Sequence, residues 1–153
     1  MMSDEPNHFV EWDDKYSVGI PLIDEQHKEL IRLTNELYKN CLSRDSGVHD
    51  FFFSAIRKAM DYVKHHFSVE EKMLENVQYP RMAEHKKQHE DFILKIVDDV
   101  KNFSDGMKIA PNSFVRFLRD WILSHIAIED KQYAAYIMDL KKHGKLDVQH
   151  TAS

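Results

Sequence analysis

Several features that would signal other classes of protein are scarce in this chain of 153 residues. It has one cysteine, Cys41, which excludes an internal disulfide framework and a cysteine-cluster metal site. The net charge of −5 argues against a nucleic-acid-binding protein. No apolar run approaches the roughly 20 residues of a membrane span, and the first residues are acidic where a signal peptide is basic. We therefore expect a cytoplasmic protein without nucleic-acid or membrane partners.

Glycine and proline are also few, with four of each, and they fall at a small number of places. Both residues interrupt helices, because proline lacks a backbone donor and glycine has excess conformational freedom. The stretches between them, at about 24–42, 48–77, 81–104 and 112–142, show apolar residues at every third or fourth position, the helical spacing. The sequence thus predicts an all-α fold, an antiparallel up-down-up-down four-helix bundle.

The ends of the chain lie outside these four predicted helices. Residues 1–22 form an N-terminal arm that is too apolar to lie free in solvent, with Phe9, Trp12, Tyr16 and Ile20. Asp24 is placed to cap the first helix. Residues 143–153 are predicted to form a polar tail. The sequence shows no internal repeat and no segment of distinct composition that would mark a second domain. We therefore expect residues 1–153 to form a single domain.

Histidine is abundant, with ten residues, and half of them lie on the apolar stripes of the predicted helices. Residues four apart on a helix share a face and lie about 6 Å from each other. In an antiparallel bundle the stripes bring these histidines to one layer, together with acidic residues. The polar residues on the stripes, in chain order, are His27, His66, Glu70, His85, His89 and His125, with Glu129 and Asp130 following.

Polar side chains on an apolar stripe need an explanation, because burying an unpaired polar group costs on the order of a few kcal/mol. A single such histidine is usually a satisfied core residue, but five at one level favour a metal site. Five imidazoles with two carboxylates exceed the needs of one ion, and their ligand type leaves iron, manganese, copper and zinc open. The other histidines are expected at the surface: His8, His49, His65, His143 and His150.

Helical geometry leaves the acidic residue of the fourth helix undecided. Glu129 lies four residues after His125 and would share its face in a regular helix, as Glu70 does with His66. Asp130 lies five residues after His125, about 140° away around a regular helix.

The ordered set of histidines and carboxylates resembles the hemerythrin family, in particular bacterial hemerythrin-like proteins. The arm and first helix read FVEWDDKYSVGIPLIDEQHKEL, and the second helix reads HFSVEEKM from His66. The third reads HKKQH from His85, and the fourth reads WILSHIAIEDKQY from Trp121. The order H…HxxxE…HxxxH…HxxxxD is matched at every position. The resemblance implies a non-heme diiron site that binds dioxygen.

The resemblance also implies a role for each residue of the set. One iron would take His85, His89 and His125, the other would take His27 and His66, and Glu70 and Asp130 would bridge both irons together with an oxo or hydroxo group. If each iron has about six ligands, the second keeps one vacancy, where dioxygen would bind. The motif favours Asp130 over Glu129, which requires a π-type widening or kink between Ile126 and Asp130.

Residues next to the ligands would form the wall of the dioxygen pocket or support the ligands, if the resemblance holds. For each apolar one, ordinary core packing is the simpler interpretation. Tyr133, three residues after Asp130, could form a hydrogen bond with a bridging carboxylate. The candidate residues of this wall and support are Leu30, Phe67, Trp121, Ile122, Ile126 and Tyr133.

Three functions are consistent with this pattern. The leading one is reversible dioxygen binding, in oxygen transport, storage or sensing, and without enzymatic turnover. Five neutral imidazoles stabilise high iron oxidation states less than the carboxylate-rich sites of ferritin-like oxidases do. The alternative is a diiron oxidase, a peroxidase or a nitric-oxide-handling enzyme on the same scaffold. The third is a structural or iron-sensing metal-binding module. A protein partner is not indicated by the sequence.

Overall fold

A computed structural model describes residues 9–42, 48–104 and 111–144 of the chain. The α-helices are α1 (Pro21–Leu42), α2 (Val48–Asn76), α3 (Met82–Ser104), α4 (Pro111–Ser124) and α5 (Lys131–Lys142). A π-helical segment, η2 (His125–Asp130), joins α4 to α5, and a short 3₁₀ turn, η1 (Asp14–Tyr16), precedes α1. These described ranges contain no strand.

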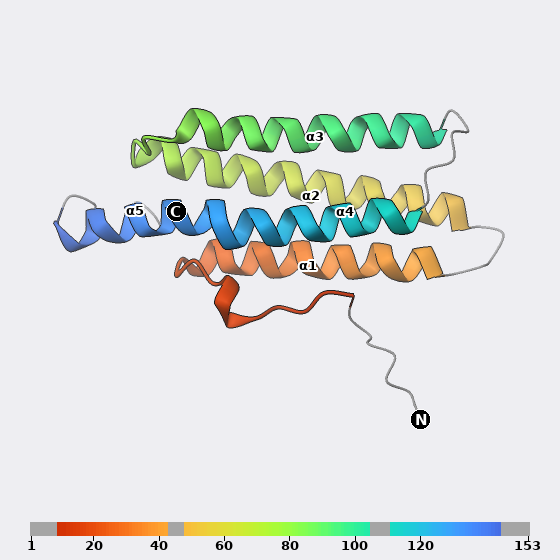
Figure 1. Cartoon of the computed structure of the whole chain (residues 1–153), viewed down its shortest axis with the longest axis horizontal. Coiled ribbons are helices and arrows are strands. Elements are labelled where there is room, and N and C mark those ends of the chain that lie inside the picture. Colours follow the sequence, from red (N-terminus) through yellow and green to blue (C-terminus); the bar gives the residue numbers. More distant parts are fainter. Residues whose placement is uncertain (1–8, 43–47, 105–110, 145–153) are drawn as a thin grey trace, which may run out of the picture.

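The helices form the predicted four-helix bundle: α1, α2 and α3 are three of its long helices, and α4, η2 and α5, which continue one another along a single axis, make up the fourth (Figure 1). α1 begins at Pro21 rather than at residue 24, and α4 begins at Pro111 rather than at residue 112. Proline suits the first helical position, where its missing N–H would have no partner within the helix. Among the described residues no helix combines the length and apolar composition of a membrane span.

Some predictions lie outside the described residues. They concern the arm before residue 9, the tail after residue 144, and the side chains of His8, His49 and His150. His65 and His143 are exposed, as predicted.

The buried apolar side chains form two clusters separated by a polar layer. The larger cluster includes Leu30, Phe67 and Phe92, and the smaller one includes Ile23 and Tyr133. Along each long helix the predicted ligand residues fall between members of the two clusters or at their border. The apolar stripes therefore hold the bundle together on both sides of the layer, at roughly 1.5–3 kcal/mol for each large side chain that is fully buried.

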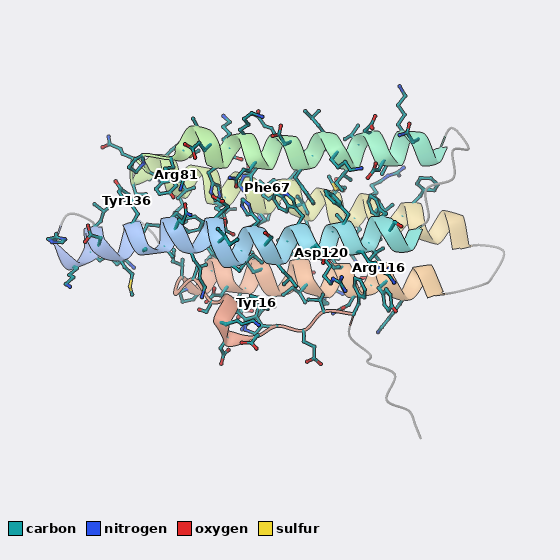
Figure 2. The ribbon with its side chains drawn as sticks, in the orientation of Figure 1. Tyr16, Phe67, Arg81, Arg116, Asp120 and Tyr136 are labelled. Atoms are coloured by element: carbon teal, nitrogen blue, oxygen red, sulfur yellow. The ribbon has the colours of Figure 1, made fainter. Side chains whose placement is uncertain are left out.

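The described part of the N-terminal arm, from residue 9 onward, packs along α1, as its aromatic residues predict. The amide group of Asn35 bonds to both backbone groups of Val10, at 2.9 Å and 2.8 Å. Phe9 stacks on Tyr38 of α1, with ring centroids 4.2 Å apart. Tyr16 of η1 lies on the arm next to the bundle (Figure 2) and packs against the larger apolar cluster. Residues of η1 also contact η2. The arm is thus bound to the bundle at the level where the fourth long helix is widened.

Asp24 does not cap α1, contrary to the sequence prediction, because the helix begins three residues earlier, at Pro21. Its carboxylate instead accepts hydrogen bonds from Ser17 Oγ at 2.5 Å and from the backbone N–H of Val18 at 2.8 Å. Between these residues and the helix, Gly19 adopts a φ of 77°, which turns the chain into α1. Asp24 therefore fastens the arm to the first turn of the helix.

Replacing Asp24 by alanine is expected to lower the free energy of unfolding by about 1–2 kcal/mol, because two part-buried donors lose their acceptor. The measurement is urea unfolding followed by circular dichroism. Glu25→Ala is the matched control, since that exposed carboxylate lies 3.3 Å from Lys28 Nζ at the surface. It should change the free energy by less than about 1 kcal/mol. Equal losses in the two variants would contradict this role of Asp24.

Candidate metal centre

The fourth long helix is widened where it carries its predicted ligands. His125–Asp130 form a π-helix, in which the backbone hydrogen bonds join residues five apart instead of four. His125 and Asp130 have that spacing, so the widened turn brings both onto the same side of the helix. The π-type widening predicted from the family motif is confirmed. Asp130 is fully buried, whereas Glu129 is only half-buried.

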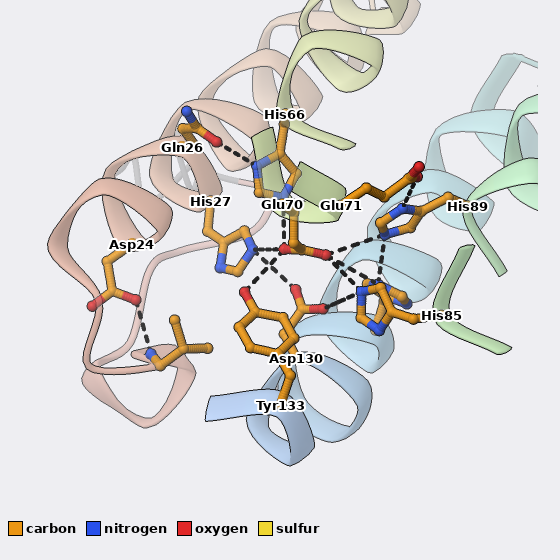
Figure 3. Close-up of polar contacts among 12 residues, drawn as sticks. Asp24, Gln26, His27, His66, Glu70, Glu71, His85, His89, Asp130 and Tyr133 are labelled. Carbon is orange, nitrogen blue, oxygen red and sulfur yellow. Dashed lines mark hydrogen bonds and ion pairs between the residues drawn. The ribbon is translucent and has the colours of Figure 1, made fainter. Parts of the chain in front are cut away.

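The structure brings all of the sequence-predicted ligand residues to one buried layer (Figure 3). None of these side chains belongs to a residue that is more than 7% exposed. They come from every long helix of the bundle: His27 from α1, His66 and Glu70 from α2, His85 and His89 from α3, and His125 and Asp130 from η2.

The potential ligand atoms form two groups, and in each group all of them lie within 4.8 Å of one another. The three-histidine group consists of Glu70, His85, His89 and His125. The two-histidine group consists of His27, His66, Glu70 and Asp130. Glu70 is common to both groups, which is the arrangement that a bridging carboxylate would need.

Glu70 turns one oxygen toward each group. Its Oε1 atom lies 2.6 Å from His85 Nε2 and 3.2 Å from His89 Nε2, on the three-histidine side. Its Oε2 atom lies 3.3 Å from His66 Nε2 and 3.8 Å from His27 Nε2.

Asp130 divides its oxygens in the same way. Its Oδ1 atom lies 3.1 Å from His125 Nε2 and 3.3 Å from His85 Nε2. Its Oδ2 atom lies 3.0 Å from His27 Nε2. Two carboxylates that each contact both groups are the side chains expected between two cations.

Four polar atoms in this layer are buried without a hydrogen bond. They are both ring nitrogens of His27 and both carboxylate oxygens of Asp130. Such groups cost roughly 1–3 kcal/mol each when they lack a partner, and more when charged. Cations between the two groups would satisfy three of these four atoms, all but the outer nitrogen of His27. Imidazole and carboxylate donors suit iron, manganese, copper or zinc, so the residues present fit a dinuclear metal centre.

The electrostatics of the layer keep its acidic residues ionised. Burial raises the pKa of Glu70, but the close contacts and charges of the surrounding imidazoles, led by His27 and His66, bring it well below its usual range. Burial and Glu70 raise the pKa of Asp130, but His125 and His27 bring it below its usual value. Burial lowers the pKa of His27, yet Asp130 and Glu70 outweigh that effect and raise it to about 9. Ionised carboxylates are the form that binds metals.

Three further side chains hold the predicted ligands in place. Tyr133 donates a hydrogen bond to Glu70 Oε2 at 3.0 Å, as the family resemblance suggested. Burial and the nearby carboxylates raise the Tyr133 pKa well above 10, so its hydroxyl stays a donor. Gln26 Oε1 lies 2.7 Å from His66 Nδ1, and Glu71 Oε2 lies 2.8 Å from His89 Nδ1.

Sequence reasoning missed Gln26 and Glu71. Each is adjacent in the chain to a predicted ligand, His27 or Glu70, and one residue is a rotation of about 100° around a helix. That rotation points them at the neighbouring helix instead of the centre. The available signal was the need of each metal-binding histidine for an acceptor at its outer nitrogen.

The predicted wall residues surround the layer on the side of the larger apolar cluster. Phe67 stacks on His89 with centroids 3.7 Å apart and planes at 2°, and Trp121 stacks on His125 at 4.5 Å and 9°. Leu30, Ile122 and Ile126 are buried in the same cluster. A small cavity of about 20 Å³ is lined by Leu30, Ile122 and mostly apolar neighbours. These contacts make the surroundings of the centre apolar on this side.

Known proteins share both this sequence and this architecture. The family model "Hemerythrin HHE cation binding domain" matches residues 18–137. A bacteriohemerythrin from Stenotrophomonas maltophilia is 32% identical over 123 residues, which cover 80% of this chain and 78% of the relative. A bacteriohemerythrin from Clostridium acetobutylicum is 30% identical over 126 residues, covering 80% and 96%. The crystal structure of a wild-type hemerythrin matches with a TM-score of 0.76 at 26% identity, covering 83% of this chain and 96% of that one. The chain belongs to the hemerythrin family.

Proposed function

We propose that this protein binds dioxygen reversibly at a non-heme diiron site, as an oxygen carrier, store or sensor module and not as an enzyme. The observation that carries the proposal is the division of the Glu70 and Asp130 oxygens between the two histidine groups. Two carboxylates arranged in this way suit a pair of metal ions. Membership of the hemerythrin family supports iron as the metal and dioxygen as the ligand.

The seven buried residues divide into ligands for two ions. In the proposal His85, His89 and His125 would hold one iron, His27 and His66 would hold the other, and Glu70 and Asp130 would serve both. When bound, the iron pair would supply the electrons that reversible dioxygen binding requires. The two-histidine group offers one imidazole fewer than the other group, so we expect dioxygen to bind on that side of the centre.

The side chains around the centre favour the release of dioxygen over the loss of reduced oxygen species such as peroxide. Leu30, Ile122 and Ile126 are buried apolar residues that limit the entry of water. Tyr133 keeps its proton, because its pKa is well above 10, and gives its hydrogen bond to Glu70. Protons promote the loss of reduced oxygen species, and these residues supply few of them.

The experiment is an optical spectrum of the reduced protein before and after exposure to air, with iron counted per chain. We expect about two irons per chain and a spectral change that reverses when oxygen is removed. One metal per chain, or stoichiometric zinc after iron-replete expression, would contradict the diiron site. Oxygen consumption with release of peroxide would favour the oxidase, peroxidase or nitric-oxide-handling alternative. Loss of fold on iron removal, without any oxygen response, would favour a structural or iron-sensing module.

Replacing Ile126 by glutamate is expected to raise the rate of autoxidation in air several-fold while iron content stays near that of the wild type. Ile126 is 2% exposed in the larger apolar cluster, so an acidic side chain there would bring water and a proton source to the wall. The rate is measured from the decay of the absorption spectrum of the oxygenated protein, by stopped-flow spectroscopy if the decay is fast. Val97→Glu is the control, since Val97 is 53% exposed on α3. An unchanged rate with full iron loading would show that Ile126 does not line the pocket.

A further inference from the structure

The two histidine groups differ in the acceptor that holds an outer ring nitrogen. His89 Nδ1 contacts the carboxylate of Glu71 at 2.8 Å, and His66 Nδ1 contacts the side-chain oxygen of Gln26 at 2.7 Å (Figure 3). Both contacts place the imidazole proton on Nδ1 and leave Nε2 free to face the centre. The distances are nearly equal, so the main difference is that Glu71 is a carboxylate and Gln26 a neutral amide.

The surroundings of these two acceptors fit that difference. Gln26 is buried, at 6% exposure, where a neutral amide is less costly than a charge. Glu71 is only part-buried, with 23% of its side chain exposed. It lines a cleft of about 430 Å³ between α2 and α3, which also reaches His89 and Phe67. The carboxylate therefore contacts a site residue on one side and solvent on the other.

His89 is also held rigidly toward the centre. The Phe67 ring is parallel to the His89 ring at 3.7 Å, which together with the Glu71 contact leaves the imidazole little freedom to rotate. A carboxylate acceptor polarises the imidazole N–H more than a neutral amide does, and this raises the basicity of the opposite nitrogen. Loss of such an outer partner typically costs 10–100-fold in metal affinity.

We propose that Glu71 is a positioning residue whose charge strengthens His89 as a ligand and makes the three-histidine group the tighter of the two metal sites. The first metal ion taken up by the apoprotein then enters the three-histidine group, and the two-histidine group fills second. This inference rests on the proposed dinuclear site, and it adds an order of filling that is determined by residues outside the ligand set.

The test is a titration of the metal-free protein with Co²⁺ in competition with a chelating dye, which gives the affinity of each step. Glu71→Gln keeps an acceptor at His89 but removes the charge, so the first step should weaken by about tenfold or more while the second changes little. Gln26→Glu places a negative charge beside His66 in the two-histidine group, so it should raise the affinity of the second binding step. The visible absorption of the first bound Co²⁺ should also change in Glu71→Gln.

Glu90→Gln is the matched control, because Glu90 lines the same cleft but is exposed on α3. It removes the same charge without a bond to His89, and both steps should stay at wild-type values. Affinities of Glu71→Gln that match the wild type, or equal losses at both steps, would overturn the inference. Should Glu71→Gln not fold, an unchanged second step in Gln26→Glu would overturn it instead. A wild-type chain that binds one Co²⁺ would contradict the dinuclear site, and the comparison of Glu71→Gln with wild type would still decide the role of Glu71.

Discussion

Replacing Asp130 by alanine is expected to remove at least one of the two metal ions, whereas the same replacement of Glu129 leaves both bound. Asp130 is fully buried and places one oxygen 3.1 Å from His125 Nε2 and the other 3.0 Å from His27 Nε2. Its loss therefore removes a ligand atom from each side of the centre. Glu129 is half-buried and belongs to neither ligand group found among the described residues.

The measurement for this pair is the number of metal ions per folded chain, from native mass spectrometry after iron-replete expression. Circular dichroism of both variants checks that the bundle is intact. The comparison is sharp because the two residues are adjacent in the π segment and both are acidic. Two metal ions in Asp130→Ala, or a loss in Glu129→Ala, would show that the widened turn does not present Asp130 to the metals.

The second large effect is a loss of metal that should distinguish two adjacent histidines of α2. His66 is 1% exposed, lies 3.3 Å from Glu70 Oε2 through its Nε2 atom, and is held by Gln26. His65 is exposed, with its ring 5.9 Å from that of Tyr62. His66→Ala should lower the metal content from about two ions to about one, because the two-histidine group would keep a single imidazole. His65→Ala should retain both ions.

Metal analysis of the purified proteins measures this difference, and dioxygen binding provides a second readout. Since we expect dioxygen to bind on the side of the two-histidine group, His66→Ala should also lose the reversible spectral change in air. Equal metal content in the two variants would contradict the assignment of His66 as a ligand. A loss of metal ions in His65→Ala alone would contradict the orientation of α2 in the structure, in which His66 faces the centre and His65 faces solvent.

Much of the fold and of the candidate site follows from the sequence alone. The apolar repeat of three or four residues defines each helix and the face that it buries, and so it also places His66 inside and His65 outside. The same repeat puts the five inner histidines and Glu70 on buried faces. The choice of Asp130 and the widened turn at His125–Asp130 needed the family motif in addition, because a regular helix favours Glu129.

Only the tertiary structure decided which side chains meet between helices. Helical periodicity gives the direction of a residue around its own axis, but not the axial shift and rotation of one helix against the next. The contacts of Gln26 with His66 and of Glu71 with His89 each join two different helices, so no pattern within one helix predicts them. Asp24 was misassigned for a related reason: its partners lie in the arm, whose irregular path has no period. The division of carboxylate oxygens between the two groups likewise depends on all the helices at once, because each distance joins atoms that packing alone brings together.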